Sequence, residues 1–381
     1  MDSKSSFRIL VFPWLAHGHV FPFLELSKKL FQKNFQIYFC STSINLDSVK
    51  KSSNLDEFSI ELIELQLPSI PELPPHYHTT KNIPPNLLPI LMQAFQSSSS
   101  NFSDIITKIK PDSLIYDGFQ PWAANFASSQ GIPSVHFCNS GSTPMSFFHH
   151  LHTHKRFDTF PFPEIYLHGY EIMDLMKQGE SLKMGDGDED FLNDLYISFG
   201  SENYLSKEQI EEIAKGLELS NVNFIWVVRF PIESDTSIDD ALPNGFLERV
   251  KDRGIIEEKW APQAEILPHE NVGGFMSHCG WSSVMESIYF GVPIVAVPLK
   301  FDQPVNSRLM VEIGVGVEVK RDDSGKFSGE NVGEAISKVI AEESGEGFRS
   351  KVRELSEKVK MEEENGFDEV AEQLSSICMK K

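Results

Sequence analysis

Two groups of residues in this chain have the types and spacing that chemistry requires, and the first is a histidine with an aspartate. His19 follows the apolar run 8–13, and Asp117 directly follows the apolar run 113–116. An imidazole can take a proton from a hydroxyl near neutral pH, while a carboxylate behind it orients the ring and stabilises the imidazolium. A histidine at such a position is more often a loop or helix-end residue, so both interpretations stay open on spacing alone.

The second group lies around residue 280. The short apolar run 274–277 suits a buried strand, a tight turn follows it, and residues 284–290 have helical spacing that stops at a glycine. Free backbone N–H groups at the start of that helix, together with the hydroxyls of Ser282 and Ser283, would bind an anion such as a phosphate. Ser283 and Glu286 also fit a capping box, so Glu286 is open to a purely structural interpretation.

Alternating strands and helices are predicted to position both groups. Short apolar runs alternate with segments of helical spacing along nearly the whole chain, which predicts parallel, doubly wound α/β sheets whose ligands bind at the carboxyl ends of the strands. The predicted strands are 8–13, 36–40, 60–67, 113–116, 195–201, 223–229, 254–259, 274–277 and 316–319. Both His19 and Asp117 lie just after such strand ends.

Length and composition restrict the class of protein. At 381 residues the chain suits two domains, and its formal net charge of -21 argues against nucleic acid or an anionic membrane as a partner. The four cysteines are widely spaced, which suits a reducing compartment. The apolar run 9–16 is short and broken by Pro13, and no segment approaches the roughly 20 apolar residues of a membrane helix. We therefore expect a cytosolic protein.

All 44 positions from Trp260 to Gln303 resemble the signature box of the plant UDP-sugar-dependent glycosyltransferases, which glycosylate small specialised metabolites. The resemblance implies that Trp260 stacks on uracil, that Gln263 and Glu286 contact uracil or ribose, that His278 and Ser283 contact the diphosphate, and that Asp302 and Gln303 hold sugar hydroxyls. The other donor-binding residues that it implies are Ser201, Ala261, Gly280, Trp281 and Ser282. Ser282 departs from the family, which usually has Asn there, so weaker diphosphate binding is expected.

The same resemblance implies the catalytic residues. The run 13–19 resembles the loop that supplies the general base of this family, and Asp117 stands at its partner position, so His19 is the predicted base. His17 is the less favoured candidate. Phe119, Trp122 and the loop 139–142 are further candidates for facing the acceptor or sugar, with core packing or turn chemistry as the favoured alternative.

The fold implied by the resemblance is GT-B, in which two Rossmann-like domains face each other across a cleft. We expect an acceptor-binding domain at 1–170, a shortened acidic linker at 171–193, a UDP-sugar-binding domain at 194–365, and a helix at 366–381 that returns to the first domain. No metal is expected, because the four histidines between 149 and 154 lack a standard ligand pattern and inverting transfer needs none. We expect a monomer that binds a UDP-sugar and a small acceptor.

The implied reaction is inverting transfer of glucose from UDP-glucose to a hydroxyl. Gln303 resembles the version of the box that goes with glucose, and the runs 12–26, 41–47 and 78–80 resemble the branch that extends the sugar of terpenoid or flavonoid glycosides. A nicotinamide-dependent oxidoreductase is disfavoured, because no Gly-x-Gly-x-x-Gly follows the first strand.

The resemblance breaks between residues 169 and 195. Only about two dozen residues stand where the family has a further strand, a helix and a linker, so the chain is internally shortened. Loss of an edge element exposes apolar surface and can misplace His19. The alternative function is therefore a catalytically impaired UDP-sugar-binding remnant.

Overall fold

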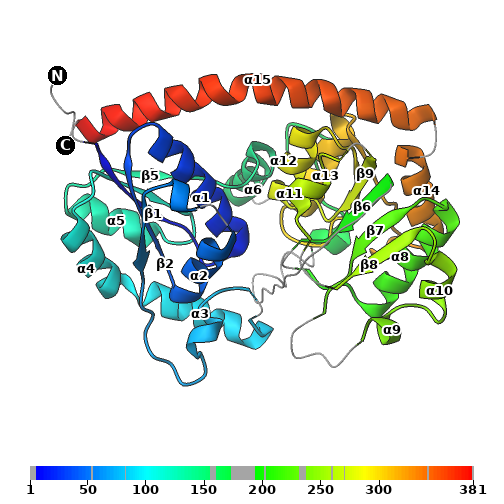
Figure 1. Ribbon diagram of the computed structural model, residues 1–381, viewed down its shortest axis with the longest axis horizontal. Coiled ribbons are helices and arrows are strands. Elements are labelled where there is room, and N and C mark those ends of the chain that lie inside the picture. Colours follow the sequence, from blue (N-terminus) through cyan, green and yellow to red (C-terminus); the bar gives the residue numbers. More distant parts are fainter. Residues whose placement is uncertain are drawn as a thin grey trace. The chain divides into compact units, whose positions relative to one another are not determined.

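The computed structural model describes residues 6–52, 55–81, 83–154, 160–172, 194–200, 203–230, 237–258, 261–269, 271–340 and 343–379. Contacts divide these residues into two compact units (Figure 1). The first unit contains residues up to Asn139 and those from Glu362 onward, and the second contains the described residues from Ser140 to Met361.

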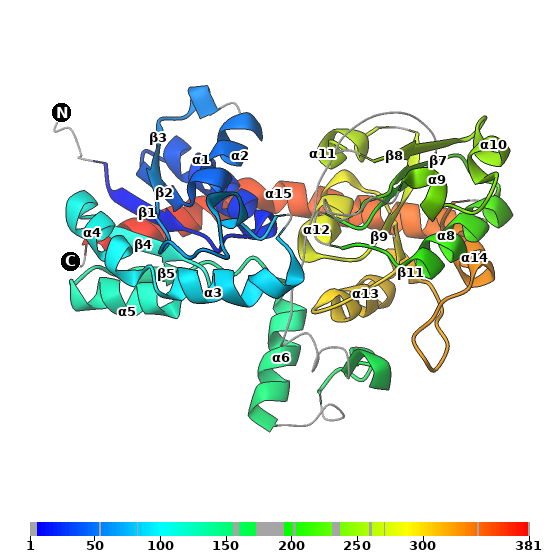
Figure 2. The same ribbon diagram turned by 90° about the horizontal axis from the view of Figure 1, so that it is seen from below.

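The first unit is built on a five-stranded parallel sheet. Its strands are β1 (Arg8–Phe12), β2 (Gln36–Ser41), β3 (Ile60–Glu64), β4 (Ser113–Tyr116) and β5 (Ser134–His136), in the order β3-β2-β1-β4-β5. Its helices are α1 (His17–Gln32), α2 (Ser43–Ser52), α3 (Leu88–Gln96), α4 (Ser99–Ile109) and α5 (Pro121–Ser129), with single 3-10 turns at Leu55–Glu57, Pro75–Tyr77 and Pro85–Leu87. Figure 2 shows α1 and α2 on one side of this sheet and α3, α4 and α5 on the other.

The central strand β1 is buried on both faces because helices cover both. Ile9 and Val11 pack into a core with residues of α1, whereas Phe12 stacks on Phe102 at 4.4 Å between ring centroids and meets the edge of Trp122. Side chains alternate between the two faces of a strand, so a continuous apolar run is what a doubly covered strand requires.

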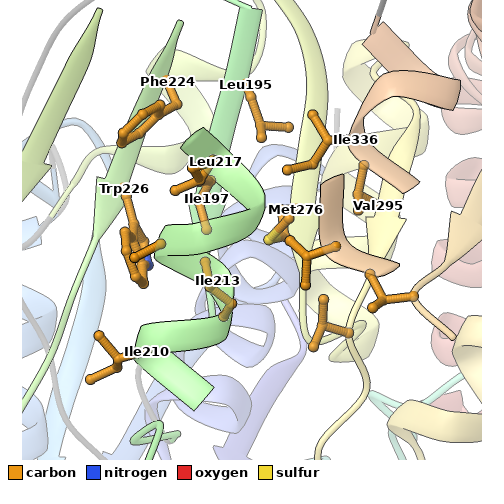
Figure 3. Close-up of a cluster of buried hydrophobic side chains, with 14 of the residues drawn as sticks. Leu195, Ile197, Ile210, Ile213, Leu217, Phe224, Trp226, Met276, Val295 and Ile336 are labelled. Atoms are coloured by element: carbon orange, nitrogen blue, oxygen red, sulfur yellow. The ribbon is translucent and has the colours of Figure 1, made fainter. Parts of the chain in front are cut away.

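The second unit has a six-stranded parallel sheet in the order β11-β10-β9-β6-β7-β8. The strands are β6 (Asp194–Ser198), β7 (Phe224–Val227), β8 (Gly254–Glu257), β9 (Val272–Ser277), β10 (Ile294–Ala296) and β11 (Gly316–Glu318). Among the described residues its helices are α6 (Ser142–His154), α8 (Lys207–Ser220), α9 (Ile238–Ala241), α10 (Phe246–Val250), α11 (Gln263–Ile266), α12 (Trp281–Phe290), α13 (Gln303–Glu312), α14 (Gly329–Ile340) and the part of α15 (Glu343–Met379) that precedes Glu362. Figure 3 shows how Ile213 and Leu217 of α8 pack with Trp226 and other side chains of the sheet.

The described residues between 140 and 172 pack with the second unit. Phe147 of α6 shares a buried cluster with Ile165, Leu167 and Val305, the last of which lies on α13. The contact boundary therefore falls after Asn139, whereas the sequence analysis placed the end of the first domain at residue 170. The expected linker 171–193 lies almost entirely outside the described residues.

Helix α15 is divided between the two units: its residues up to Met361 belong to the second unit and those from Glu362 onward to the first. In the second unit its Ser356 hydroxyl donates to the Tyr289 carbonyl at 2.6 Å, and Val352 is fully buried. In the first unit Ala371, Leu374 and Cys378 join the core beneath α1, and Lys33 pairs with Asp368. Two parallel, doubly wound sheets, each with its own core, confirm the predicted α/β fold of two Rossmann-like domains. Among the described residues, no helix has both the length and the hydropathy that crossing a bilayer requires.

Candidate active site

His19 and Asp117 meet at the carboxyl edge of the first sheet. His19 lies in the first turn of α1, which follows β1, and Asp117 follows β4, which pairs with β1. The imidazole Nδ1 lies 2.7 Å from the Asp117 Oδ2. The carboxylate side chain is 4% exposed and the histidine side chain is 23% exposed. An ionised carboxylate only accepts hydrogen bonds, so Nδ1–H donates to it and Nε2 keeps the lone pair that takes a proton.

Backbone donors fix the carboxylate in this position. The Phe119 N–H donates to Oδ1 at 3.3 Å, and the Trp14 N–H donates to Oδ2 at 3.4 Å. Both oxygens of Asp117 therefore accept hydrogen bonds from the loops around them. This arrangement fixes the orientation of the His19 ring, because the carboxylate that accepts from its Nδ1–H is itself held in place.

Residues outside the predicted catalytic pair hold the loop that carries His19. The Asn45 amide donates to the Leu15 carbonyl at 3.3 Å, and the single hydrogen of the Thr79 hydroxyl is shared between the Asn45 Oδ1 at 2.7 Å and the Leu15 carbonyl at 3.2 Å. On the other side of the histidine, the Asn139 amide donates to the Gly18 carbonyl at 2.9 Å. Three separate segments of the first unit, at residues 45, 79 and 139, thus contact this loop.

The remaining candidates of the first unit differ in whether they lie near His19 or pack in the core. Phe119 is 39% exposed, stacks on Trp14 at 5.2 Å and presents its edge to His19 at 5.4 Å. Trp122 instead packs in the aromatic cluster with Phe12, which agrees with the core alternative. His17 is buried with its ring edge-on to Phe21 at 5.1 Å.

In the second unit, His278 lies at the end of β9 in a space kept open by two glycines. A Cβ built on Gly280 would lie 2.6 Å from the His278 Nε2, and one on Gly200 would lie 2.7 Å from its Cε1. Burial, with a smaller effect of the Lys300 charge, lowers the pKa of His278 to about 3. The ring is therefore neutral at physiological pH. No described residue gives its buried Nδ1 a hydrogen-bond partner.

The first turn of α12 is suited to bind an anion. Its N-cap is Gly280, and no side chain of the described residues caps it, so the backbone N–H groups there remain available. Ser283 is buried in this turn and Ser282 is exposed. The capping box of Ser283 and Glu286 is not formed, because the helix starts before Ser283.

Glu286 instead binds a glutamine from the preceding helix. The Gln263 amide donates to Glu286 Oε2 and to the Ser283 hydroxyl, the latter at 3.3 Å. Burial raises the pKa of Glu286, and the bond from Gln263 partly offsets this. The structure thus brings together three of the predicted donor-binding residues.

Asp302 and Gln303 begin α13, and both are held by hydrogen bonds. The Gln303 Oε1 accepts from the N–H groups of Leu299 and Lys300 at 3.0 and 2.9 Å, so its amide nitrogen is the group left for a ligand. The Asp302 Oδ2 accepts from the Ser140 hydroxyl at 3.3 Å.

Asn306 connects Asp302 to the turn beside His278, and the sequence analysis missed it. Its amide nitrogen lies 3.1 Å from the Asp302 Oδ2 and 3.0 Å from the Cys279 carbonyl, and the residue is fully buried. Cys279 has a φ of +62°, which is uncommon outside glycine. Asn306 therefore connects a strained turn to Asp302, the N-cap residue of α13. An Asn one helical turn after Asp302 is the only sign of this in the sequence.

Other predicted donor residues have packing roles or lie outside the description. Trp281 packs over Gly141, where an added Cβ would lie 2.7 Å from its ring, and Ala261 is buried beside Ile266. Ser201 and Trp260 are not among the described residues.

The histidines of α6 form one stacked pair. His150 and His154 stack with ring centroids 4.1 Å apart. Across the described part of the chain, no three His, Cys, Asp or Glu side chains gather in a way that would hold a metal ion.

Plant glycosyltransferases are among the known proteins with similar sequences. A family profile described as "UDP-glucoronosyl and UDP-glucosyl transferase" matches residues 189–360. The chain is 41% identical to the beta-D-glucosyl crocetin beta-1,6-glucosyltransferase of Gardenia jasminoides over 440 residues, covering 96% of this chain and 98% of that one. It is 42% identical to a mogroside IIIx synthase of Siraitia grosvenorii, with 96% and 97% covered.

Solved structures agree in fold. The Glycyrrhiza uralensis UGT73P12 complexed with glycyrrhetinic acid 3-O-monoglucuronide superposes with a TM-score of 0.83 at 22% identity, covering 98% of this chain and 97% of that one. TcCGT1 in complex with UDP gives a TM-score of 0.77 at 24% identity, with 98% and 100% covered.

The sequence comparisons also bear on the length of the chain. The alignment with the Gardenia enzyme extends over 440 residues, although 96% of the 381 residues here is about 366, so about 74 aligned positions have no counterpart. This agrees with an internally shortened chain. Identity above 40% over nearly its whole length shows that the chain belongs to the plant UDP-glycosyltransferases, the family of UDP-glucoronosyl and UDP-glucosyl transferases.

Proposed function

We propose that this protein transfers glucose from UDP-glucose to a hydroxyl of a small plant glycoside, with inversion, to give a β-glucoside. The observation that carries the proposal is the bond between His19 Nδ1 and Asp117 Oδ2, which leaves Nε2 of a partly exposed ring as a proton acceptor. In the reaction the acceptor oxygen attacks the anomeric carbon and gives its proton to Nε2. The bond from that carbon to the diphosphate breaks, and its electron pair leaves with UDP.

The donor side of the proposal rests on the turn that begins α12. Its uncapped N–H groups and the buried Ser283 suit a diphosphate, and the positive end of the helix dipole would stabilise the charge that develops on departing UDP. The proposal assigns no role to a metal ion. Gln303, whose amide nitrogen remains available, supports glucose as the transferred sugar by its resemblance to the glucose-type box.

The acceptor side of the proposal rests on relatives that act on glycosides. The Gardenia enzyme is named for glucosyl crocetin and the Siraitia enzymes for a mogroside, and a Bellis perennis relative at 38% identity is named for cyanidin 3-O-glucoside. We therefore infer that the acceptor here is also a glycoside, of terpenoid or flavonoid type. We also propose a monomer in the cytosol, which fits the four free cysteines and the negative charge.

An impaired remnant is not favoured. The described first unit keeps a five-stranded sheet, and the His19–Asp117 pair is formed and held by backbone donors. A remnant whose first domain had lost its catalytic half would not retain this geometry.

Donor and acceptor choice can be tested in one experiment. The protein is incubated with UDP-glucose or UDP-galactose and with terpenoid and flavonoid glycosides beside their sugar-free aglycones, and products are followed by mass spectrometry and NMR. We expect one added hexose in β linkage, formed from UDP-glucose on the existing sugar. Products formed only from aglycones, or in α linkage, would contradict the proposal.

A further inference from the structure

A cluster of buried polar side chains adjoins the loop that leads from β1 to His19. Thr42 of this cluster donates to the His78 carbonyl at 2.6 Å, which attaches the segment after residue 77 to the start of α2. Buried polar groups need hydrogen-bond partners, so the partners of these side chains show which part of the fold they hold. The members, each at most 3% exposed, are Ser41, Thr42, Asn45, Thr79 and Thr80.

The cluster converges on the carbonyl of Leu15, which is itself a fully buried residue. Besides the contacts from Asn45 and Thr79, this oxygen accepts from the Thr80 N–H at 3.1 Å and from the Thr80 hydroxyl at 3.2 Å. A carbonyl oxygen has two lone pairs, so donors from residue 45 and from residues 79–80 share it. The peptide group that follows Leu15 is therefore held by segments that are distant in the sequence.

This peptide group stands between two backbone groups that contact the catalytic pair. On one side the Trp14 N–H donates to the Asp117 Oδ2 at 3.4 Å. On the other side the Ala16 carbonyl accepts from the His19 N–H at 2.9 Å. Rotation of the peptide between Leu15 and Ala16 changes the dihedral angles that join these two groups. The orientation of the Leu15 carbonyl thus affects how His19 lies relative to Asp117.

The Thr79 hydroxyl orients the amide of Asn45. It accepts from the Lys81 N–H at 3.2 Å, and its own hydrogen is directed to the Asn45 Oδ1 at 2.7 Å and to the Leu15 carbonyl. With Oδ1 engaged in this way, the amide nitrogen lies 3.3 Å from the Leu15 carbonyl and 3.4 Å from the Ser41 hydroxyl. Loss of the Thr79 hydroxyl would take this donor from a buried amide oxygen, which favours reorientation of the amide.

Burial separates this role from contact with an acceptor. Asn45 is fully buried and Thr79 is 1% exposed, so neither presents the surface that an acceptor would touch. Both side chains therefore influence the reaction through the backbone that they hold.

We propose that Asn45 and Thr79 are positioning residues for His19. They fix the Leu15 peptide and, through it, the geometry of His19 against Asp117. A displacement of about 1 Å at a reacting group can cost about a hundredfold in rate. The Thr80 N–H would still hold the Leu15 carbonyl if the Thr79 hydroxyl were lost, so we expect a smaller displacement and a loss of about tenfold. This kinetic effect rests on the proposed function, because it requires His19 to act as a base.

The test compares two variants of Thr79. Thr79→Val keeps the shape of the side chain and removes its hydroxyl, whereas Thr79→Ser keeps the hydroxyl. The matched control is Ser27→Ala, which removes a fully buried hydroxyl that donates to the Phe23 carbonyl at 2.7 Å within α1. Thr79→Val and Ser27→Ala each remove one buried hydroxyl, so their thermal midpoints should fall alike, by a few degrees.

Initial rates of UDP release give kcat, and KM is measured for UDP-glucose and for the glycoside. We expect kcat to be about tenfold lower in Thr79→Val, with both KM values within about threefold of wild type. In Thr79→Ser and in Ser27→Ala, kcat should stay within about twofold of wild type. A loss of stability alone would not separate Thr79→Val from Ser27→Ala.

A second measurement does not depend on turnover. In protein with isotopically labelled histidine, a long-range proton–nitrogen NMR spectrum distinguishes a ring that carries its proton on Nδ1 from one that carries it on Nε2. The signals of His19 are assigned by their loss in His19→Gln. We expect the Nδ1–H form in wild type and in Thr79→Ser, as the contact with Asp117 requires, and both forms in Thr79→Val.

Several results would overturn the proposal. Thr79→Val with the kcat and the single tautomer of wild type would show that the hydroxyl does not position His19. Thr79→Ser as impaired as Thr79→Val, or Ser27→Ala equally impaired, would reduce the effect to packing or stability. A higher KM for the glycoside at unchanged kcat would assign Thr79 to acceptor binding instead. If the wild type shows no turnover, the proposed function fails, while the NMR comparison still decides the positioning role.

Discussion

Replacement of Asp117 by Asn tests how the first unit activates an acceptor hydroxyl. Both carboxylate oxygens accept backbone hydrogen bonds, Oδ1 from Phe119 and Oδ2 from Trp14, and Oδ2 also accepts from His19. In either orientation the amide NH₂ of an asparagine would face a group that now donates to the carboxylate, either the Phe119 N–H or the Trp14 N–H together with His19. With the NH₂ toward His19, the imidazole must accept at Nδ1 and carry its proton on Nε2, where it can no longer act as a base.

The size of the effect follows from the lost charge. The 2.7 Å between Nδ1 and Oδ2 puts the two charge centres about 4 Å apart once His19 is protonated, and at an effective dielectric constant of about 20 their attraction is about 4 kcal/mol. Asp117 is 3% exposed and the His19 side chain is 23% exposed, so solvent and salt screen this attraction only in part. Since about 1.4 kcal/mol corresponds to tenfold in rate, we expect kcat to fall about a thousandfold.

The assay is initial-rate release of UDP at saturating glycoside, with KM for UDP-glucose measured in parallel. KM should stay within about threefold, because Asp117 belongs to the first unit and the predicted donor residues to the second. Asp112→Asn is the matched control: this carboxylate accepts from the Arg8 N–H at 2.8 Å near the start of β1, and its loss should affect stability rather than kcat. A kcat of Asp117→Asn within tenfold of wild type would refute the reasoning.

Three further predictions concern the second unit. Asn306→Ala should raise KM for UDP-glucose at least tenfold, because Asp302 loses a hydrogen bond that holds it. The Kd of UDP should change less, since the N-terminus of α12 is less affected; an equal rise in KM and Kd would contradict this. Gly280→Ala should weaken UDP binding by calorimetry, since its Cβ would displace the His278 ring, whereas Gly169→Ala, with open space around it, should not. The lowered pKa of His278 means that the unfolded chain binds a proton that the folded one excludes. The contribution of His278 to the free energy of unfolding is therefore fully present above about pH 6.5 and falls by about 2 kcal/mol when the pH is lowered to 5. Urea unfolding at pH 7 and at pH 5 should show a smaller loss of stability in His278→Gln than in the wild type.

Much of the fold could be predicted because the pattern that encodes it is local. Buried runs such as Arg8–Phe12 and Val272–Ser277 are apolar at nearly every position, as strands covered on both faces must be. In a parallel sheet the carboxyl ends of neighbouring strands share one edge, so placing His19 and Asp117 after two such runs was enough to expect that they could meet.

The supporting contacts could not be predicted, because they depend on which distant segments meet. Asn45 and Thr79 are ordinary polar residues in the sequence, and their role at the Leu15 carbonyl appears only when two loops pack together. Likewise, the apolar spacing of Phe147 and Ile165 shows that they are buried but not in which core. The expected boundary at residue 170 therefore differed from the contact boundary.

The most direct test of the whole account compares wild type with His19→Ala in UDP release from UDP-glucose on a panel of plant glycosides, with UDP binding as the control for folding. The account predicts turnover by the wild type, and loss of at least a thousandfold in His19→Ala with UDP binding retained. Wild-type protein that binds UDP but shows no turnover, or a His19→Ala variant as active as the wild type, would contradict it.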